Sequence, residues 1–217
     1  MSGQLPPGAW PRLHDLGRWI GRGPFAWAFR VRVSGRSRVP AHGPVVVVAN
    51  HSSMVDGPIL FGVLPRRVVF LIKQEMFRGP AGWGLRRIGQ LAVRRGAPDR
   101  APLVAAQGVL RAGGVVGVFP EGTRGAGDVA QAQQGAAWLA RTTGAAVVPV
   151  ACRGTLRPPG SGRRFRPVVD VLVGEPFELP AEKGRAALEK ATEQVRDRLA
   201  TLVAELDSKR SASGEAR

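Results

Sequence analysis

The hydrophobic positions form short apolar runs that alternate with longer amphipathic stretches. The apolar runs, rich in valine, lie at residues 45–49, 68–72, 91–93, 115–119, 145–151 and 168–173. Helical spacing of apolar positions appears between or after them, at residues 98–112, 129–143 and 181–206. Strands that are apolar throughout and alternate with helices are typical of a parallel sheet covered on both faces. The pattern predicts an α/β fold, a single domain with a largely parallel sheet flanked by helices.

The residues before the first predicted strand have a different character. Tryptophan, phenylalanine and leucine side chains are interleaved with arginines there, and Leu13, Leu16 and Ile20 repeat at helical spacing. Pro24 and its neighbouring glycines predict a break into two short helices. We therefore expect residues 1–40 to form an amphipathic helical segment, which could pack on the domain, lie at a membrane interface, or do both.

The remaining divisions follow from composition. Residues 41–206 are expected to form the folded domain, and residues 207–217, which are small and polar, a disordered tail. No run of about 18 apolar residues is present, so no transmembrane helix is predicted. The N-terminus also lacks the basic-then-apolar order of a signal peptide.

Charge adds a constraint on partners. The formal net charge is +16, nearly all of it from arginine, and such a field attracts nucleic acid, anionic lipid or phosphorylated small molecules. Cys152 is the only cysteine, so no internal disulfide can form. Cys152 and the three histidines lack ligand-like spacing, so no metal site is predicted.

The first candidate site is the run N-H-S-S-M-V-D-G directly after the strand at 45–49. Ligands of parallel α/β sheets gather where strands end, and a histidine paired with a carboxylate can act as a general base. His51 and Asp56 are therefore candidates for such a pair. The alternative is that Asn50 or Ser52 merely caps a helix whose first turn holds Asp56.

Three further runs follow other predicted strands. F-P-E-G-T-R at 119–124 supplies an acceptor, a close-approach glycine and a forked cation, which suit a phosphate or polar headgroup, although an ordinary turn would also fit. G-Q-L-A-V-R-R at 89–95 ends in two arginines, and K-Q-E-M-F begins at Lys73. V-V-P-V-A at 147–151 places Pro149 in a buried strand, where a special backbone position is expected.

In this order and at these separations, the motifs resemble those of the glycerolipid acyltransferase family, and within it the 1-acylglycerol-3-phosphate acyltransferases. The resemblance covers residues 44–153. It implies that His51 is the general base, that Asp56 orients it, and that no acyl-enzyme forms. It also implies that Lys73 and Arg95 contact the phosphate of the acceptor. The residues implied to line the acceptor's glycerol and headgroup are Glu121, Gly122, Thr123 and Arg124.

By this resemblance the expected reaction transfers a fatty acyl group from acyl-CoA or acyl carrier protein to 1-acyl-glycerol-3-phosphate, giving phosphatidic acid without a further cofactor. The expected location is peripheral, on the cytoplasmic face of an anionic membrane surface. One alternative is a relative that acts on another lysophospholipid or lipid acceptor. A more distant one is a basic nucleic-acid-binding protein, but that class does not explain the motifs, and no specific nucleic-acid partner is expected.

Overall fold

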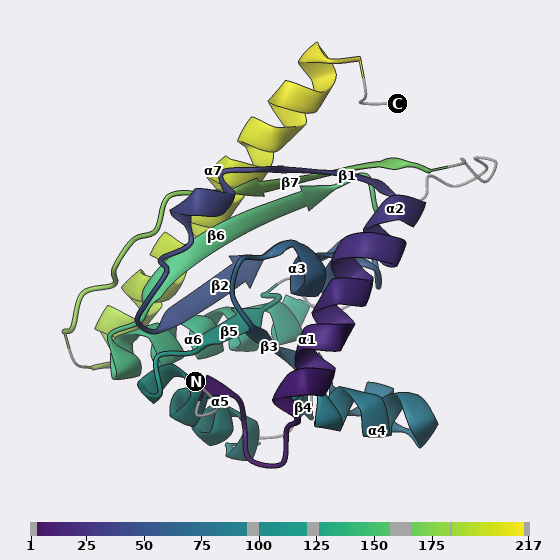
Figure 1. Ribbon diagram of the computed structural model, residues 1–217. Coiled ribbons are helices and arrows are strands. Elements are labelled where there is room, and N and C mark those ends of the chain that lie inside the picture. The colour runs from purple at the N-terminus through teal and green to yellow at the C-terminus, as the bar shows by residue number, and fades with distance from the viewer. Residues whose placement is uncertain (1–3, 95–99, 121–125, 157–165, 183, 215–217) are drawn as a thin grey trace.

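A single sheet forms the centre of the computed structural model, which describes residues 4–94, 100–120, 126–156, 166–182 and 184–214, with side chains in α6 from residue 134 onward. Within these residues the sheet has seven strands in the order β1-β7-β6-β2-β5-β3-β4 (Figure 1). Neighbouring strands are parallel, except that β6 and β7 are antiparallel. The strands are β1 (Arg30–Ser34), β2 (Val45–Ala49), β3 (Val68–Lys73), β4 (Leu91–Val93), β5 (Val115–Val118), β6 (Ala146–Arg153) and β7 (Val168–Val173).

Helices cover both faces of this sheet. They are α1 (Pro11–Ile20), α2 (Ala26–Ala28), α3 (Asp56–Val63), α4 (Gly79–Arg87), α5 (Ala101–Arg111), α6 (Ala126–Thr143) and α7 (Arg185–Ala212). A π-helical turn, η2 (Gly21–Phe25), and two 3-10 turns, η3 (Arg36–Arg38) and η4 (Gln74–Phe77), complete the set. The prediction of a single, largely parallel α/β domain is confirmed.

The core is divided between the two faces because successive side chains of a strand point in opposite directions. In β2, Val46 and Val48 pack with α5, α6 and α7, whereas Val45 and Val47 pack with α3. Every residue of β2 is buried, since β2 lies between β6 and β5 near the middle of the sheet. The continuous apolar runs of the sequence therefore reflect strands that are covered from both sides.

The N-terminal segment departs from the prediction in two ways. First, α1, η2 and α2 follow one another without the expected break, because Pro24 lies in a wider π-helical turn that accommodates its missing N–H. Gly21 in this turn meets Gly62 of α3 so closely that a Cβ on Gly62 would lie 2.5 Å from the Gly21 carbonyl carbon. Second, residues 30–34 form β1 and pair with β7, so the boundary placed at residue 41 is wrong.

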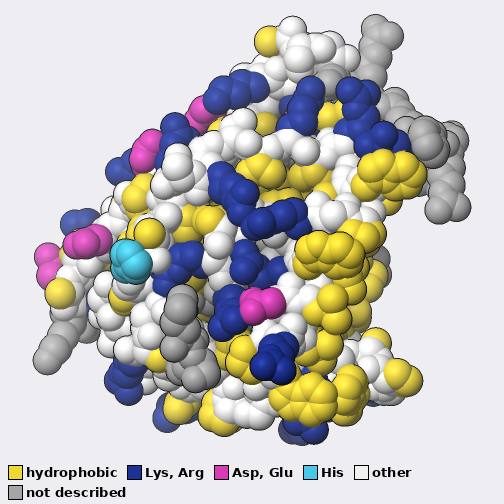
Figure 2. Space-filling view, viewed as in Figure 1, with side chains coloured by type: hydrophobic (Ala, Val, Ile, Leu, Met, Phe, Trp, Pro, Cys, Tyr) yellow, Lys and Arg dark blue, Asp and Glu magenta, His cyan; other side chains and the backbone are white. Residues whose placement is uncertain are grey.

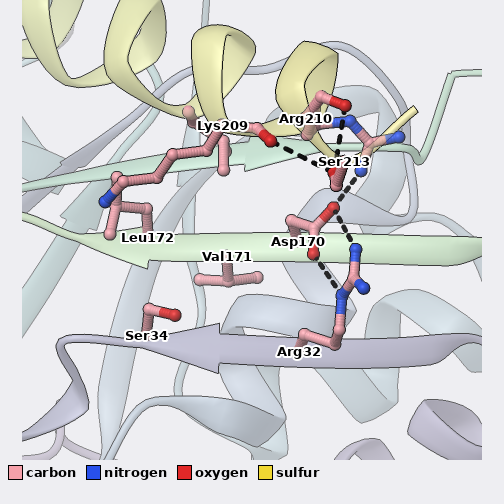
Figure 3. A pocket seen from close by; sticks show the side chains of 9 residues that line it. Arg32, Ser34, Asp170, Val171, Leu172, Lys209, Arg210 and Ser213 are labelled. Atoms are coloured by element: carbon pink, nitrogen blue, oxygen red, sulfur yellow. Dashed lines mark hydrogen bonds and ion pairs between the residues drawn. The ribbon is translucent and has the colours of Figure 1, made fainter. Parts of the chain in front are cut away.

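The C-terminal helix is longer than predicted. α7 continues to Ala212 and projects beyond the sheet in Figure 1, so the prediction of a disordered tail from residue 207 is wrong for its first six residues. Ion pairs stabilise these turns. Arg153 donates from Nε and Nη2 to the Asp207 carboxylate oxygens at 2.7 and 2.9 Å, and Arg210 donates to Asp170. Figure 3 shows Asp170 between Arg210 and Arg32, whose Nε lies 2.7 Å from its carboxylate. Long-range charge pairing, which local composition does not reveal, stabilises the last turns.

Pro149 has the special position that the sequence predicted. The residue pairs with β2 on one side, opposite Val48, while pairing with β7 begins only at Val150. Its carbonyl accepts a bond from the Gly174 N–H at 2.9 Å, just after β7 has ended. The missing N–H of Pro149 therefore falls where the β6–β7 ladder is interrupted.

Candidate active site

The carboxyl end of β2 carries the candidate catalytic pair. The strand ends at Ala49, His51 follows two residues later, and Asp56 begins α3. The intervening turn is closed by the Asp56 N–H, which donates to the Ser53 carbonyl at 3.1 Å. This short turn brings the two side chains together, at the edge where the five parallel strands all end.

The Asp56 carboxylate is the centre of this turn. Its Oδ2 lies 3.2 Å from His51 Nδ1 and accepts the backbone N–H groups of Ser52 at 2.7 Å and Ser53 at 2.8 Å. An ionised carboxylate only accepts hydrogen bonds, so Nδ1 of His51 carries the proton and donates it. The other ring nitrogen, Nε2, is then unprotonated and can act as a base.

Burial and hydrogen bonding act on Asp56 in opposite directions. The side chain of Asp56 is 0% exposed and that of His51 20% exposed. Burial, the largest single influence, favours the protonated acid, but the hydrogen bonds to the carboxylate, the one from His51 first among them, outweigh it and hold the pKa of Asp56 below its ordinary value. Asp56 therefore stays ionised at neutral pH and keeps the orientation of His51 fixed.

Asn50 connects this turn to the neighbouring strand. Its Nδ2 donates to the Cys152 carbonyl at 3.0 Å, and its Oδ1 accepts the Cys152 N–H at 2.7 Å. The Cys152 thiol in turn lies 3.7 Å from Asp56 Oδ1, and burial raises the pKa of this thiol, so it remains a protonated donor. Sequence reasoning treated Asn50 as a possible helix cap, but α3 has no side-chain cap and Asn50 instead fastens β2 to β6.

Aromatic side chains support the face of the His51 ring. The ring centroid of Phe119 lies 4.5 Å from that of His51, and Phe70 stacks on Phe119 at 5.2 Å with an interplanar angle of 13°. Phe70 occupies the space left by Gly117, where an added Cβ would lie 2.3 Å from the ring. Sequence reasoning did not identify this contact, although Phe119 belongs to the F-P-E-G-T-R motif.

The remaining predicted residues are only partly placed. Lys73 ends β3 at the same edge of the sheet, two strands from β2, and is exposed. None of the ion pairs in the described part of the chain involves Lys73. The other predicted residues lie outside the described residues: Arg95, Glu121, Gly122, Thr123 and Arg124. The structure therefore brings together His51 and Asp56 from the predicted set.

The chain is similar to known acyltransferases in sequence and structure. It is 30% identical over 174 residues to a 1-acyl-sn-glycerol-3-phosphate acyltransferase of Bacillus subtilis, covering 76% of this chain and 85% of the relative. A lyso-ornithine lipid O-acyltransferase of Pseudomonas aeruginosa is 37% identical over 138 residues, which are 61% of this chain and 51% of the relative. The crystal structure of the 1-acyl-sn-glycerophosphate (LPA) acyltransferase PlsC from Thermotoga maritima superposes with a TM-score of 0.66 and 28% identity. That superposition covers 89% of this chain and 79% of PlsC.

The family match covers the candidate site itself. The sequence model of the Acyltransferase family matches residues 30–153, more than half of the chain. This range begins at β1 and ends with β6, so it includes the His51–Asp56 pair and the strands around it. The chain belongs to the acyltransferase family.

Proposed function

We propose that this acyltransferase moves a fatty acyl group from acyl-CoA or acyl carrier protein to the free hydroxyl of 1-acyl-glycerol-3-phosphate, giving phosphatidic acid for phospholipid synthesis. The observation that carries the proposal is the buried Asp56 carboxylate, 3.2 Å from His51 at the carboxyl end of β2. The names of the Bacillus and Thermotoga relatives support this acceptor.

In this mechanism His51 Nε2 takes the proton of the acceptor hydroxyl while Asp56 stabilises the cation that forms on the ring. The hydroxyl oxygen attacks the thioester carbonyl carbon, the new C–O bond forms, and the C–S bond then breaks. The thiolate leaves with the proton from His51, so the pair returns to its starting state. No cofactor is needed, because the acyl thioester already carries the activated group.

The acceptor's phosphate requires cations near this edge of the sheet. We assign this role to Lys73, which the structure places at the end of β3, and to Arg95, which follows β4 in the sequence. An arginine can bind phosphate through two parallel hydrogen bonds. The glycerol and headgroup would lie against the segment from Glu121 to Arg124.

The exposed apolar side chains favour a membrane-surface location. Trp19 and Trp27 are 65% and 63% exposed, and other large apolar residues lie near them on the same helical segment and on α4. Figure 2 shows hydrophobic side chains gathered along the side of the molecule where α1, α2 and α4 lie. Met54 and Leu156, also exposed, follow the ends of β2 and β6 beside the candidate site. Within the described residues, no helix is both long and apolar enough to cross a membrane.

Such a surface could rest on a bilayer with the catalytic edge toward the lipid, so that both the acceptor and the acyl product stay in the membrane. The strong positive charge favours the anionic cytoplasmic leaflet. We therefore propose a peripheral attachment on that face.

The test is acyl transfer by purified protein from labelled acyl-CoA, and from acyl carrier protein, to lysophosphatidic acid in mixed micelles. His51→Ala should lower kcat by about two to four decades, the usual contribution of general acid–base catalysis. His42→Ala, on an exposed loop, is the matched control and should keep full activity. Near-normal turnover by His51→Ala would disprove the proposed role of the histidine.

The Pseudomonas relative gives a second candidate, transfer to a lyso-ornithine lipid. A panel of acceptors with and without a phosphate separates the two. Preference for phosphate-bearing acceptors, lost in Arg95→Ala, supports lysophosphatidic acid. Turnover with lyso-ornithine lipid alone would replace the first candidate with the second.

A further inference from the structure

Four arginines come together on the face of the molecule that α1 and α3 cover. Arg22 is one turn after Arg18, Arg67 pairs with Asp15 one turn before Arg18, and Arg36 is close enough for its charge to act on Arg18. Arg18 is in α1, Arg22 in η2, Arg36 in η3, and Arg67 immediately precedes β3. We call these residues the arginine cluster. Asp15, one turn before Arg18, is the carboxylate paired with the cluster among the described residues.

Two members of the arginine cluster, Arg67 and Arg18, form hydrogen bonds within the protein. Arg67 forms a bidentate pair with Asp15 at 2.8 and 2.5 Å, and Arg18 donates from Nη2 to the Leu64 carbonyl at 2.6 Å. Arg18 Nε is buried and has no acceptor among the described residues. Arg22 and Arg36 are exposed, and no described residue forms a hydrogen bond or ion pair with either. The cluster therefore has unused donors.

The four guanidinium groups also affect one another. Burial, followed by the charge of Arg22, lowers the pKa of Arg18, and the same two causes in the same order lower the pKa of Arg36. Because one carboxylate faces four cations, most of the repulsion is uncompensated within the protein. A bound anion would relieve this repulsion and satisfy the open donors.

The position of the cluster indicates where that anion comes from. On α1, Leu16 and Ile20 are one turn apart on one exposed flank, Arg18 lies on the other, and Trp19 lies between them. Figure 2 shows Lys and Arg side chains in the middle of this face, beside the hydrophobic side chains along α1 and α2. An apolar surface bordered by arginines fits a bilayer whose phosphates lie just above the acyl chains.

We propose that the arginine cluster is a binding site for the phosphate group of anionic phospholipids, separate from the His51–Asp56 site and used to hold the enzyme on the membrane. The inference rests on the proposed peripheral attachment. It assigns the apolar surface to insertion and the cluster to the choice of anionic over zwitterionic lipid.

The experiment measures sedimentation of the whole chain with vesicles of phosphatidylcholine, with and without phosphatidylglycerol, at about 0.1 M salt, where long-range charge effects are damped. The double variant Arg22→Gln/Arg36→Gln removes the two exposed members, which have no hydrogen-bond or ion-pair partner among the described residues. Each cation near an anionic surface contributes about fivefold, so binding to the phosphatidylglycerol vesicles should weaken roughly 10- to 30-fold. Binding to pure phosphatidylcholine should not change.

The control is Arg185→Gln/Arg196→Gln, which removes the same charge from exposed positions on α7. An equal loss in this control would show that only the net charge matters and would overturn the site. Displacement by millimolar inorganic phosphate, but not by chloride of equal ionic strength, would assign the cluster to free phosphate instead. Unchanged vesicle binding with a selective loss of transfer from acyl carrier protein would assign it to that acidic partner. The binding assay needs no turnover, so failure of the proposed activity would leave its outcome intact.

Discussion

The side chain of Asn50 should contribute to both stability and catalysis, although it touches no substrate atom in the proposed reaction. Asn50 is 1% exposed and makes two hydrogen bonds with the backbone of Cys152, at 3.0 and 2.7 Å. In Asn50→Ala both bonds are lost, and the N–H and C=O groups of Cys152 remain buried without partners. A buried group left without its hydrogen-bond partner costs roughly 1–3 kcal/mol, so with two such groups the free energy of unfolding should fall by about 2–6 kcal/mol.

The assay is urea unfolding followed by circular dichroism, with kcat measured on the folded enzyme. The slope of the unfolding free energy against urea should stay constant, because the surface exposed on unfolding is nearly unchanged. Asn50→Asp is a sharper variant: its oxygen still accepts the Cys152 N–H, but a second oxygen then faces the Cys152 carbonyl. This variant should be stabilised as the pH falls and the new carboxyl becomes protonated. A change below about 0.5 kcal/mol in Asn50→Ala, the range of ordinary surface substitutions, would refute the reasoning.

Three further outcomes are expected. Gly117→Ala places a Cβ 2.3 Å from the Phe70 ring, so the free energy of unfolding should fall by about 1–3 kcal/mol, and kcat should drop as the aromatic support of His51 shifts. The control Gly108→Ala, with open space at its Cβ, should be neutral or stabilising, and similar melting temperatures of the two variants would contradict the packing argument. The pKa of buried His14 is lowered from 6.5 to about 4, mainly by burial, so the unfolded chain takes up the proton first as the pH falls. The free energy of unfolding should therefore fall by about 2 kcal/mol from roughly pH 7 to pH 4.5. In His14→Gln this dependence of the unfolding free energy on pH should flatten, and an unaltered dependence would exclude the histidine as its source. Asp170→Asn should lower the melting temperature, with a cost of about 1–3 kcal/mol, because the nearly buried Asp170 carboxylate accepts from two arginines. Asp207→Asn, in a more exposed pair, should cost under about 1 kcal/mol, and the reverse order would show that the contacts of Asp170 are not the stronger ones.

The sequence by itself determined the elements whose signals are local. Val45–Ala49, Leu91–Val93 and Val168–Val173 have the predicted bounds. The clearest case is Val45–Ala49, because a strand covered on both faces needs an unbroken apolar run. The His51–Asp56 pair was also readable, since five positions of chain around a turn are short enough to force the two side chains together.

Only the tertiary structure decided the features that depend on distant partners. Asn50 and Cys152 are 102 positions apart, so no spacing rule could reveal that their hydrogen bonds fasten β6 beside the Asp56 carboxylate. β1 has two valines among polar residues and is a strand because β7 offers an edge, and the last turns of α7 are ordered because Asp170 and Arg153 meet Arg210 and Asp207. The arginine cluster likewise combines segments whose individual charges are unremarkable in the sequence, since repulsion among cations exists only once folding has brought them together.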